Sequence, residues 1–566
     1  MTTFPGYTSP HTHEFGELEQ LSGWQTQSVT FVSRSHTLIE GEAGGPMTYV
    51  PLPAPQSVTK PGGRCVDRIS SFWFDLIHVF PRRIDLGNVL NTVEVESFVY
   101  NAFRTAKTWQ DFINNVGAGL TVPDLPTLPA SLDAQSGVAV TITVSVNGPP
   151  SIDETLDYEF LGLYTVSQPI TGTRIVLLPF RPQRPIREYM VFFTNVYESV
   201  SGDEQRSSQR PTPGQEFVLD FLFEESRSRR RFDSLLFDWQ ARVFGVPVWY
   251  EPSILSSAAS VNDLTINVDT TAYGDFRVGG LAIVWESSLK FDALQIESFT
   301  STTITFTSGL TFAYSQGVEV FPVRTAIMDQ TVQAPRTQKN SQRFTSTFTV
   351  TEPTPDLADI SAWNTLEGLV YLDDPNVIDR VVSDQFTRRV YVVDHKLGAI
   401  EQYTPWTHNK RVSAKGFSTN SRQELYELRG LLHYLKGKRV PFFLPTFYEE
   451  VVVVEDLQNG TAVMVIENIG FSTYVGSTVR SPRDKLRLLL ANGTILHRTV
   501  SAASAIDDDT EQITFTTNWT SDISASDIVR VDYVERSRFD EDRIEIVHAN
   551  SIGEAEVRIP TRSLFS

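Results

Sequence analysis

An internal repeat constrains the fold of this chain more than any other feature of its sequence. One copy contains RRRFDSLLFDWQARVFGVPVWYEPS at residues 229–253, and the other contains SRQELYELRGLLHYLKGKRVPFFLPTF at residues 421–447. Apolar side chains recur at helical spacing in both copies, which predicts one amphipathic helix in each. The residues on these stripes are Leu236, Trp239 and Val243 in the first copy and Leu428, Leu431 and Leu435 in the second.

The ends of the two predicted helices follow a common pattern. Ser421 and Glu424 have the spacing of a capping box at the start of the second helix. We expect the helices to end at Gly245 and Gly437, each followed by Val-Pro and an aromatic strand. Because proline cannot donate to a ladder, each strand should begin near a sheet edge. The aromatic residues of these strands are expected in the core rather than in a receptor pocket: Trp249, Tyr250, Phe442 and Phe443.

A β-rich module follows each helix–strand unit. The predicted strands of the first copy are DLTINVDT, LAIVWES, TTITFTSG and GVEVFPVR. Those of the second copy are AVMVIEN, LRLLLANG, EQITFTTN and DIVRVDYV, in the same order. Ile304–Phe306 and Ile513–Phe515 stand at matching places. The shared order indicates a duplication, in which each unit carries a small β-barrel-like module.

The region before the first copy shows strand periodicity. In GVAVTITVSVNG, apolar residues alternate with small or polar ones from Val138 to Val146, which is typical of a half-buried antiparallel strand. The segments Ile84–Leu90 and Val99–Asn101 resemble immunoglobulin-like domains of the ASPM/SPD-2/Hydin type. This resemblance implies a β-sandwich that serves as an interaction or spacer module and carries no chemistry.

The predicted fold class is therefore mainly β and multi-domain, with an immunoglobulin-like β-sandwich and two duplicated helix–strand and small β-barrel-like modules. The expected division is an extended N-terminal arm (1–71), the sandwich (72–200), the first helix–strand unit (201–252), its β-module (253–327), a β-rich region with the second helix–strand unit (328–447), its β-module (448–537) and a C-terminal strand segment (538–566).

Charge and cysteine content exclude several classes of function. The formal net charge is -20, and a phosphate-binding surface needs an excess of lysine and arginine. We therefore expect no direct contact with nucleic acid. Cys65 is the only cysteine, so an intrachain disulfide or a thiolate metal cage is excluded. The chain shows no secretion signal at its start and no apolar run of the length that a membrane helix needs. We expect synthesis in a reducing cytoplasm and no membrane insertion.

No residue pattern rises to a catalytic, cofactor-binding or metal site, and we predict none of the three. His11 and His13 lack further ligands nearby. The run Asp507–Asp509 lacks the spaced ligands of a calcium loop and is expected to be a solvated turn. Asp394–His395 and His408 have no nucleophile motif beside them.

A basic run stands out in this acidic chain and is the one candidate interaction site. Its members are Arg227, Arg229, Arg230 and Arg231, at the start of the first predicted helix. One interpretation is a subunit interface in which guanidinium groups pair with acidic residues of a neighbour. The alternative is a solvated helix N-terminus, where cations are slightly unfavourable because of the helix dipole.

The second half resembles bacteriophage tail and baseplate proteins, in particular distal-tail and adaptor proteins. The resemblance rests on QRFTSTFTVTEP, on residues 427–457 and on the β-module that follows to about Glu535. It implies a virion protein, made in the host cytoplasm, that forms a homo-oligomeric ring, commonly six-fold, linking the tail to the adsorption apparatus and touching other tail proteins. The host surface would be contacted only indirectly.

Three alternatives remain open from the sequence. The chain could form a non-contractile sheath or collar of a short tail. It could instead be an adsorption protein that binds host-surface saccharide through its β-modules. The third alternative, a glycan-degrading enzyme, lacks the long β-helix repeat that tailspike depolymerases carry.

Overall fold

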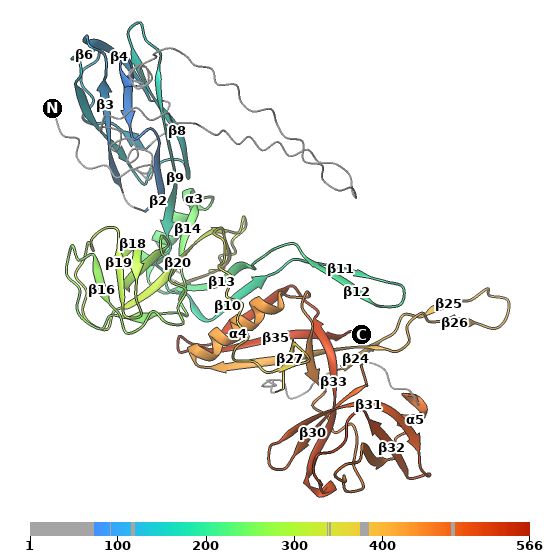
Figure 1. The fold of residues 1–566 in the computed structure, drawn as a ribbon. Helices are drawn as coiled ribbons and strands as arrows, with labels where there is room; N and C mark the ends of the chain where they lie inside the picture. Colours follow the sequence, from blue (N-terminus) through green and yellow to red (C-terminus); the bar gives the residue numbers. More distant parts are fainter. Residues whose placement is uncertain are drawn as a thin grey trace, which may run out of the picture. The chain divides into compact units, whose positions relative to one another are not determined.

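The computed structural model describes residues 73–90, 92–114, 119–336, 338, 341–373, 384–476 and 482–565. These residues form a mainly β, multi-domain protein, as predicted (Figure 1). The expected N-terminal arm, with His11, His13 and Cys65, lies outside the described residues.

Two packed sheets form the N-terminal β-sandwich. One sheet contains β1 (Ile77–Phe80), β3 (Val93–Asn101), β7 (Gly137–Val144) and β5 (Leu120–Thr121). The other contains β2 (Ile84–Val89), β9 (Val166–Leu177), β8 (Ser151–Phe160), β4 (Lys107–Asn114) and β6 (Ala130–Leu132). Val99 and Val140 from the first sheet share one hydrophobic core with Trp109 and Tyr158 from the second.

The sandwich ends earlier than the sequence predicts. Strand β9 leaves the sandwich at its C-terminal end, where Ile175 pairs in parallel with Val243 and joins the next hydrophobic core. The predicted boundary at residue 200 falls in the turn of a later hairpin, between β11 and β12. The alternation of apolar residues cannot show that β9 passes from one core to the next, because β9 is a regular strand throughout.

The first repeat begins at β10. Its elements are β10 (Gln183–Val191), β11 (Thr194–Glu198), β12 (Glu204–Ser208), β13 (Gly214–Phe223), α3 (Ser226–Trp239), β14 (Val243–Pro247), β15 (Ser253–Ile254), β16 (Thr265–Asn267), β17 (Leu281–Ser287), β18 (Lys290–Phe299), β19 (Thr303–Phe306), β20 (Glu319–Met328) and β21 (Gln342–Val350).

The second repeat follows a short hairpin of β22 (Thr365–Leu366) and β23 (Leu369–Val370). Its elements are β24 (Asp384–Thr387), β25 (Tyr391–Val393), β26 (Glu401–Tyr403), β27 (Lys410–Asn420), α4 (Arg422–Leu435), β28 (Phe442–Pro445), β29 (Val463–Glu467), α5 (Phe471–Tyr474), β30 (Lys485–Leu490), β31 (Ile495–Ala505), β32 (Thr510–Phe515), a 3-10 turn (Ala525–Asp527), β33 (Ile528–Phe539), β34 (Arg543–His548) and β35 (Glu554–Ser563).

The main strand pairings of the two repeats correspond to one another. In both repeats the strand before the helix pairs with the last strand, as β13 with β21 and β27 with β35. The strand after the helix pairs with a long module strand, as β14 with β20 and β28 with β33. Each repeat also carries one projecting hairpin, β11–β12 or β25–β26 (Figure 1). The duplication extends further than the sequence comparison indicated, because it includes these hairpins and the strands beside them.

The helices occupy equivalent positions in the two cores. Helix α4 begins at residue 422, 196 positions after the start of α3 at residue 226, and both have the same length. Their core-facing residues coincide under this shift: Phe232, Leu235, Leu236 and Trp239 in α3, and Leu428, Leu431, Leu432 and Leu435 in α4. A shift of 196 therefore identifies equivalent residues in the first and second repeats.

One predicted helix end is right and the other is wrong. Helix α4 ends at Leu435, and Gly437 follows it with a φ of 61°. Helix α3 already ends at Trp239, so Val243 and Gly245 belong to β14 instead. A Cβ at Gly245 would lie 2.9 Å from Leu177 Cδ1, so this glycine permits the close approach of β9 rather than ending a helix.

The two small modules have their own hydrophobic cores but are not closed barrels among the described residues. In the first, continuous ladders run through β15, β20, β17, β18, β19 and β16, and only an isolated bridge between Leu255 and Val268 joins the two ends. In the second, an isolated bridge between Val453 and Ile466 stands at the matching place.

Candidate functional site

The two repeats are joined edge to edge within the chain. Strand β10 of the first repeat pairs antiparallel with β34 of the second, from Ile186 opposite His548 to Val191 opposite Arg543. Because β10 also pairs with β13, and β34 with β35, the main sheets of both repeats become continuous. This junction is the most distinctive polar feature of the described chain.

A buried ionic cluster lies at the centre of the junction. Glu188, on β10, receives a hydrogen bond and an ion pair from Arg429 of α4. Its other oxygen accepts a hydrogen bond from Gln215 Nε2 at 2.7 Å. His548 Nε2 lies 2.9 Å from Glu188 Oε2, and the His548 ring stacks on Tyr250 with a centroid distance of 3.7 Å. Four elements of the two repeats thus meet at one carboxylate.

The protonation states follow from burial and charge. Burial alone would raise the pKa of Glu188, but Arg429 and the hydrogen bonds from His548 and Gln215 outweigh it and lower the pKa to about 2. Burial lowers the pKa of His548, and Glu188 opposes this only in part. Glu188 is therefore charged at neutral pH, and neutral His548 donates its Nε2 proton to it.

Local sequence patterns do not predict this cluster, although one signal is visible in the sequence. Arg429 lies between Leu428 and Leu431 on the apolar stripe of α4, and a charged side chain in that position must find a buried partner. The partners stand 179 to 241 residues away along the chain, so no local pattern could identify them.

Outside this cluster, further ion pairs tie the first hairpin to the second repeat. Glu204 of β12 is buried and pairs with Arg538 Nε at 2.7 Å and with Lys410 Nζ at 3.1 Å. Asp542 accepts hydrogen bonds from the backbone N–H groups of Thr194 and Lys438. These contacts hold the β11–β12 hairpin against the second repeat at both ends, at Thr194 in its base and at Glu204 beside its turn.

The first repeat contributes Glu188, Gln215 and Tyr250 to the cluster. Equivalent residues of the second repeat lie at the edge of β24. Under the shift of 196, Asp384 corresponds to Glu188 and Arg411 to Gln215, and the Arg411 guanidinium binds Asp384 at 2.6 Å. Tyr448 follows β28 in the segment Phe-Tyr-Glu, as Tyr250 follows β14 in Trp-Tyr-Glu. Arg411 lies 5.9 Å from the ring of Tyr448, whose side chain is 45% exposed. Among the described residues, β24 pairs only with β27.

The predicted arginine site divides between two roles. Arg231 donates a hydrogen bond to Ser288 O at 2.7 Å and lies over the ring of Phe180, so it supports its own repeat. Arg230 donates to Ser226 O within α3 and is otherwise exposed. Arg227 is also exposed, and Arg229 is half-buried. Arg227, Arg230 and Arg231 stand three and four positions apart on α3 and are therefore neighbours on the helix surface.

The other candidate residues lie in turns, hairpins and hydrophobic cores. Asp507 accepts hydrogen bonds from Asp509 and Thr510 in the turn between β31 and β32. Asp394 and His395 lie in the β25–β26 hairpin, whereas His408 packs against Phe565. The aromatic residues of the strands after the helices are buried, as predicted: Trp249, Tyr250, Phe442 and Phe443.

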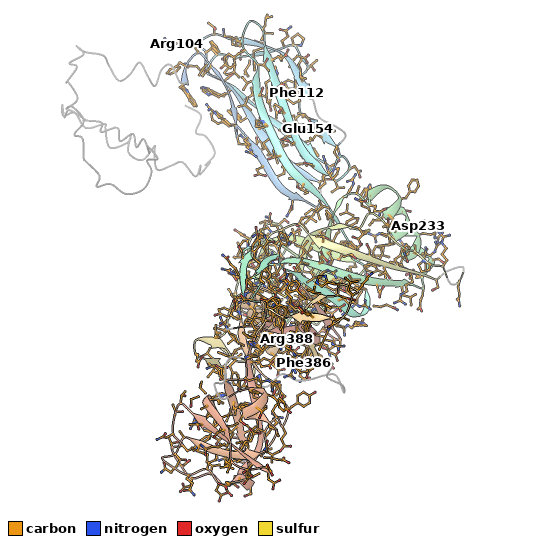
Figure 2. All side chains as sticks on the ribbon, turned by 90° about the vertical axis from the view of Figure 1, so that its right-hand side faces the viewer. Arg104, Phe112, Glu154, Asp233, Phe386 and Arg388 are labelled. Atoms are coloured by element: carbon orange, nitrogen blue, oxygen red, sulfur yellow. The ribbon has the colours of Figure 1, made fainter. Side chains whose placement is uncertain are left out.

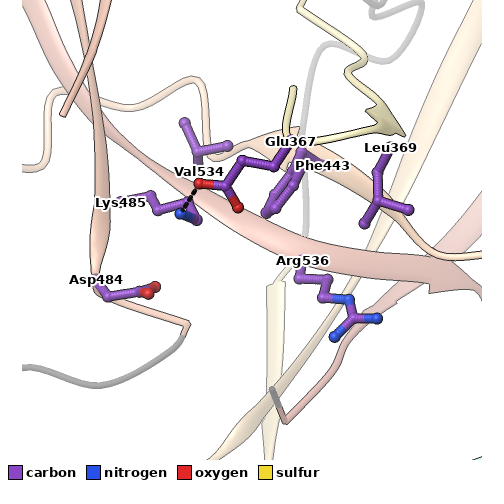
Figure 3. Close-up of a pocket in the computed structure, with 7 residues that line it drawn as sticks. All are labelled: Glu367, Leu369, Phe443, Asp484, Lys485, Val534 and Arg536. Carbon is purple, nitrogen blue, oxygen red and sulfur yellow. Dashed lines mark hydrogen bonds and ion pairs between the residues drawn. The ribbon is translucent and has the colours of Figure 1, made fainter. Parts of the chain in front are cut away.

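A shallow recess lies beside the second module (Figure 3). Lys485 forms an ion pair with Glu367 across it at 2.5 Å, and Asp484 and Arg536 lie on its rim. Burial raises the pKa of Asp484, and the nearby Lys485 opposes this shift. Phe443 and Val534 provide its apolar floor. The lining residues carry no pairing of a nucleophile with a base.

No group of three or more His, Cys, Asp and Glu side chains in the described ranges could hold a metal ion. No helix in the same ranges is long and apolar enough to cross a membrane. No known family profile matches the sequence, and no curated protein is significantly similar to it.

Proposed function

We propose that this chain is a non-enzymatic structural subunit of a ring in a bacteriophage tail, at the distal tail or the tail-tip adaptor that links the tail to the adsorption apparatus. The observation that carries the proposal is the junction between the repeats. The chain holds two copies of one unit joined through sheet edges and a buried ionic cluster. The most elaborate polar contacts of the molecule therefore serve to join like units.

The location in a phage tail rests on the resemblance of the second half to distal-tail and adaptor proteins. The exposed β25–β26 hairpin and the edge of β24, which pairs only with β27 among the described residues, support the same assignment. Exposed strand edges are a liability for a monomer and useful in an assembly. A closed cyclic assembly uses each such edge once per subunit. Other tail proteins would bind above and below the ring, in the virion.

Electron microscopy of the purified full-length chain tests the proposal, together with quantitative mass spectrometry of phage particles. We expect closed rings in the first measurement, and a fixed integral copy number per particle in the second. A chain that stays monomeric at every concentration and is absent from particles would rule out the proposed function.

A further inference from the structure

The internal junction has two sides, and the described residues contain a second copy of each side outside this junction. One side is the edge of β10 with Glu188, and its equivalent is the edge of β24 with Asp384. The other side is β34 with His548, and the strand registers identify its equivalent in the first repeat.

Phe223 and Thr419 are equivalent under the shift of 196, and they pair with Gln342 and Ala555 respectively. Gln342 forms an isolated antiparallel β-bridge with Arg336, and Ala555 likewise pairs with His548. Arg336 therefore occupies the position of His548, and the segment 332–336 occupies the position of β34. The carbonyl groups of Gln333 and Pro335 already accept hydrogen bonds from β21, so the backbone groups of Val332 and Arg336 face the opposite edge, as those of alternate residues of a strand do. The carbonyl of Ala334 accepts a hydrogen bond from the Gln342 side chain at 3.0 Å.

We infer that copies of this chain join by repeating the internal junction: the edge of β24 in one copy pairs antiparallel with the segment 332–336 of the next, and Arg336 binds Asp384. This inference rests on the proposed ring function and names the contact that builds the ring. Each copy offers one edge of either kind, so the contact propagates from head to tail.

The charges on the two unused sides are complementary. Asp384 has one carboxylate oxygen bound to Arg411, and its other oxygen, Oδ1, is buried without a hydrogen-bond partner among the described residues. Arg336 is 66% exposed and lies 4.0 Å from Asp233. Asp233 stands at the position of Arg429 under the shift of 196. In the internal junction, the anion Glu188 lies between the cation Arg429 and His548. In the contact between copies, the cation Arg336 would lie between the two anions Asp384 and Asp233.

Apolar and aromatic side chains at the same edge fit this contact. Phe386 of β24 is 57% exposed, and Figure 2 labels it, together with Asp233 on α3. Phe386 corresponds to Met190, which is buried in the internal junction. Tyr448 stands where Tyr250 stacks on His548, so the guanidinium of the incoming Arg336 would lie over an exposed aromatic ring.

The equivalence also selects one arginine from the predicted cluster. Tyr426 of α4 contacts Tyr273 of the first repeat, with ring centroids 6.0 Å apart. Arg230 is its equivalent in α3, so Arg230 faces the neighbouring copy. Arg227 corresponds to Gln423, whose side chain bonds Glu427 on its own helix, so the equivalence assigns Arg227 no contact with a neighbouring copy.

Charge reversal tests the pairing. We expect Asp384→Arg and Arg336→Glu each to weaken association of the full-length chain by about tenfold or more, because close opposite charges become like charges. The combined variant should regain most of the wild-type association, measured by sedimentation velocity over a concentration series. If both single variants associate as the wild type does, the pairing is wrong while the ring function stands. A wild-type chain that neither associates nor enters particles overturns both.

Disulfide trapping tests the register without changing a charge. The internal pair Tyr189 and Glu545 corresponds to Gln385 and Gln333, and both glutamines are exposed. Opposed antiparallel residues have Cα atoms about 4.5–5.5 Å apart, which a disulfide can span. In a Cys65→Ser background, mixing a Gln333→Cys chain with a Gln385→Cys chain should give a covalent heterodimer on oxidation. A matched Gln330→Cys chain should not. Equal yields from both mixtures, or none from either, would contradict the register.

Discussion

At the scale of single residues, substitutions of buried charges should matter more than substitutions of exposed ones. Arg429 is the clearest case, because it alone supplies a full positive charge to Glu188 and also bonds Tyr250. Burial lowers its pKa, but Glu188, Tyr250 and Glu251 outweigh that effect and raise the pKa well above the ordinary range. Such a group is charged at any accessible pH.

Removing Arg429 should be costly. We expect Arg429→Met to lower the free energy of unfolding by about 3–5 kcal/mol, because Glu188 would remain buried without its main counter-charge. The double variant with Glu188→Gln should recover part of this loss. The matched control is Arg187→Met on the same strand, whose half-exposed side chain makes only a 4.0 Å pair and should cost less than about 1 kcal/mol. Urea titration measures all four chains, and an equal loss in Arg187→Met would contradict the argument.

His433 gives a pH dependence with a definite sign. Burial, followed by the repulsion of Arg429, lowers its pKa to about 4. Between pH 6.5 and 4 the unfolded histidine binds a proton that the folded one does not, so stability falls as the pH falls through this window. We expect wild-type chain to lose about 2–3 kcal/mol more than His433→Gln between pH 7 and pH 4. Parallel pH profiles from urea titrations would refute this assignment.

The arginine run offers a residue-level test of the proposed contact between copies. Arg230→Glu should weaken self-association about three- to tenfold, because Arg230 stands at the position where Tyr426 touches the other repeat. Arg227→Glu carries the same charge change on the same helix and should leave association unchanged. Light scattering at matched concentrations compares the two. Equal effects would show that net charge, rather than position, governs assembly.

At the scale of elements, the sequence predicts what depends on local periodicity. The helices, the capping of α4 by Ser421 and the order of the module strands all follow from patterns within a few residues. Ser421 does accept a hydrogen bond from the backbone of Glu424, as the capping box predicts. The division of β9 between two cores, and the place of Gly245 in a strand, depend on partners far away in the sequence. Periodicity carries no record of such partners.

The junction itself lay beyond prediction for the same reason. Glu188 and His548 stand 360 residues apart, and each looks like an ordinary polar residue of an alternating strand. The arginine run is conspicuous because of its local charge density, yet the repeat equivalence gives only Arg230 a position at the contact between copies. In this chain the internal junction is marked by a single buried charge, Arg429, and not by a run of charges.

The two equivalent hairpins should differ in their contribution to stability. Replacing residues 391–403 by a two-residue Asn-Gly turn should change the free energy of unfolding by less than about 0.5 kcal/mol, because the β25–β26 side chains are exposed. The same replacement of residues 195–207 removes Glu204, the shared ion-pair partner of Lys410 and Arg538, together with the part of the hairpin that packs on the second repeat. That should cost about 3 kcal/mol or more. Thermal unfolding compares the variants, and equal losses would contradict the asymmetry.

At the scale of the whole molecule, one chain contributes two repeat positions to any ring that it forms. The rotational symmetry of the ring is then half the number of its repeat positions, and internal junctions alternate with junctions between copies. Because both sides of the internal junction belong to one chain, they meet at a high effective concentration. The contact between copies must form without that help, which makes it the step that solution conditions control.

The net charge of the chain makes association between copies depend on salt. Each copy carries a formal charge of -20, so copies repel one another at long range, whereas the Arg336–Asp384 pair attracts only at contact. The Debye length falls from about 30 Å at 0.01 M salt to about 8 Å at 0.15 M, which screens long-range repulsion more than a close, partly buried pair. We therefore expect the association constant of wild-type chain to rise several-fold between these salt concentrations. In Asp384→Arg, where a like-charge contact is screened too, the rise should be steeper. Sedimentation velocity at both salt concentrations measures this, and a steady weakening of wild-type association with added salt would mean that contact ion pairs outweigh the repulsion between whole chains.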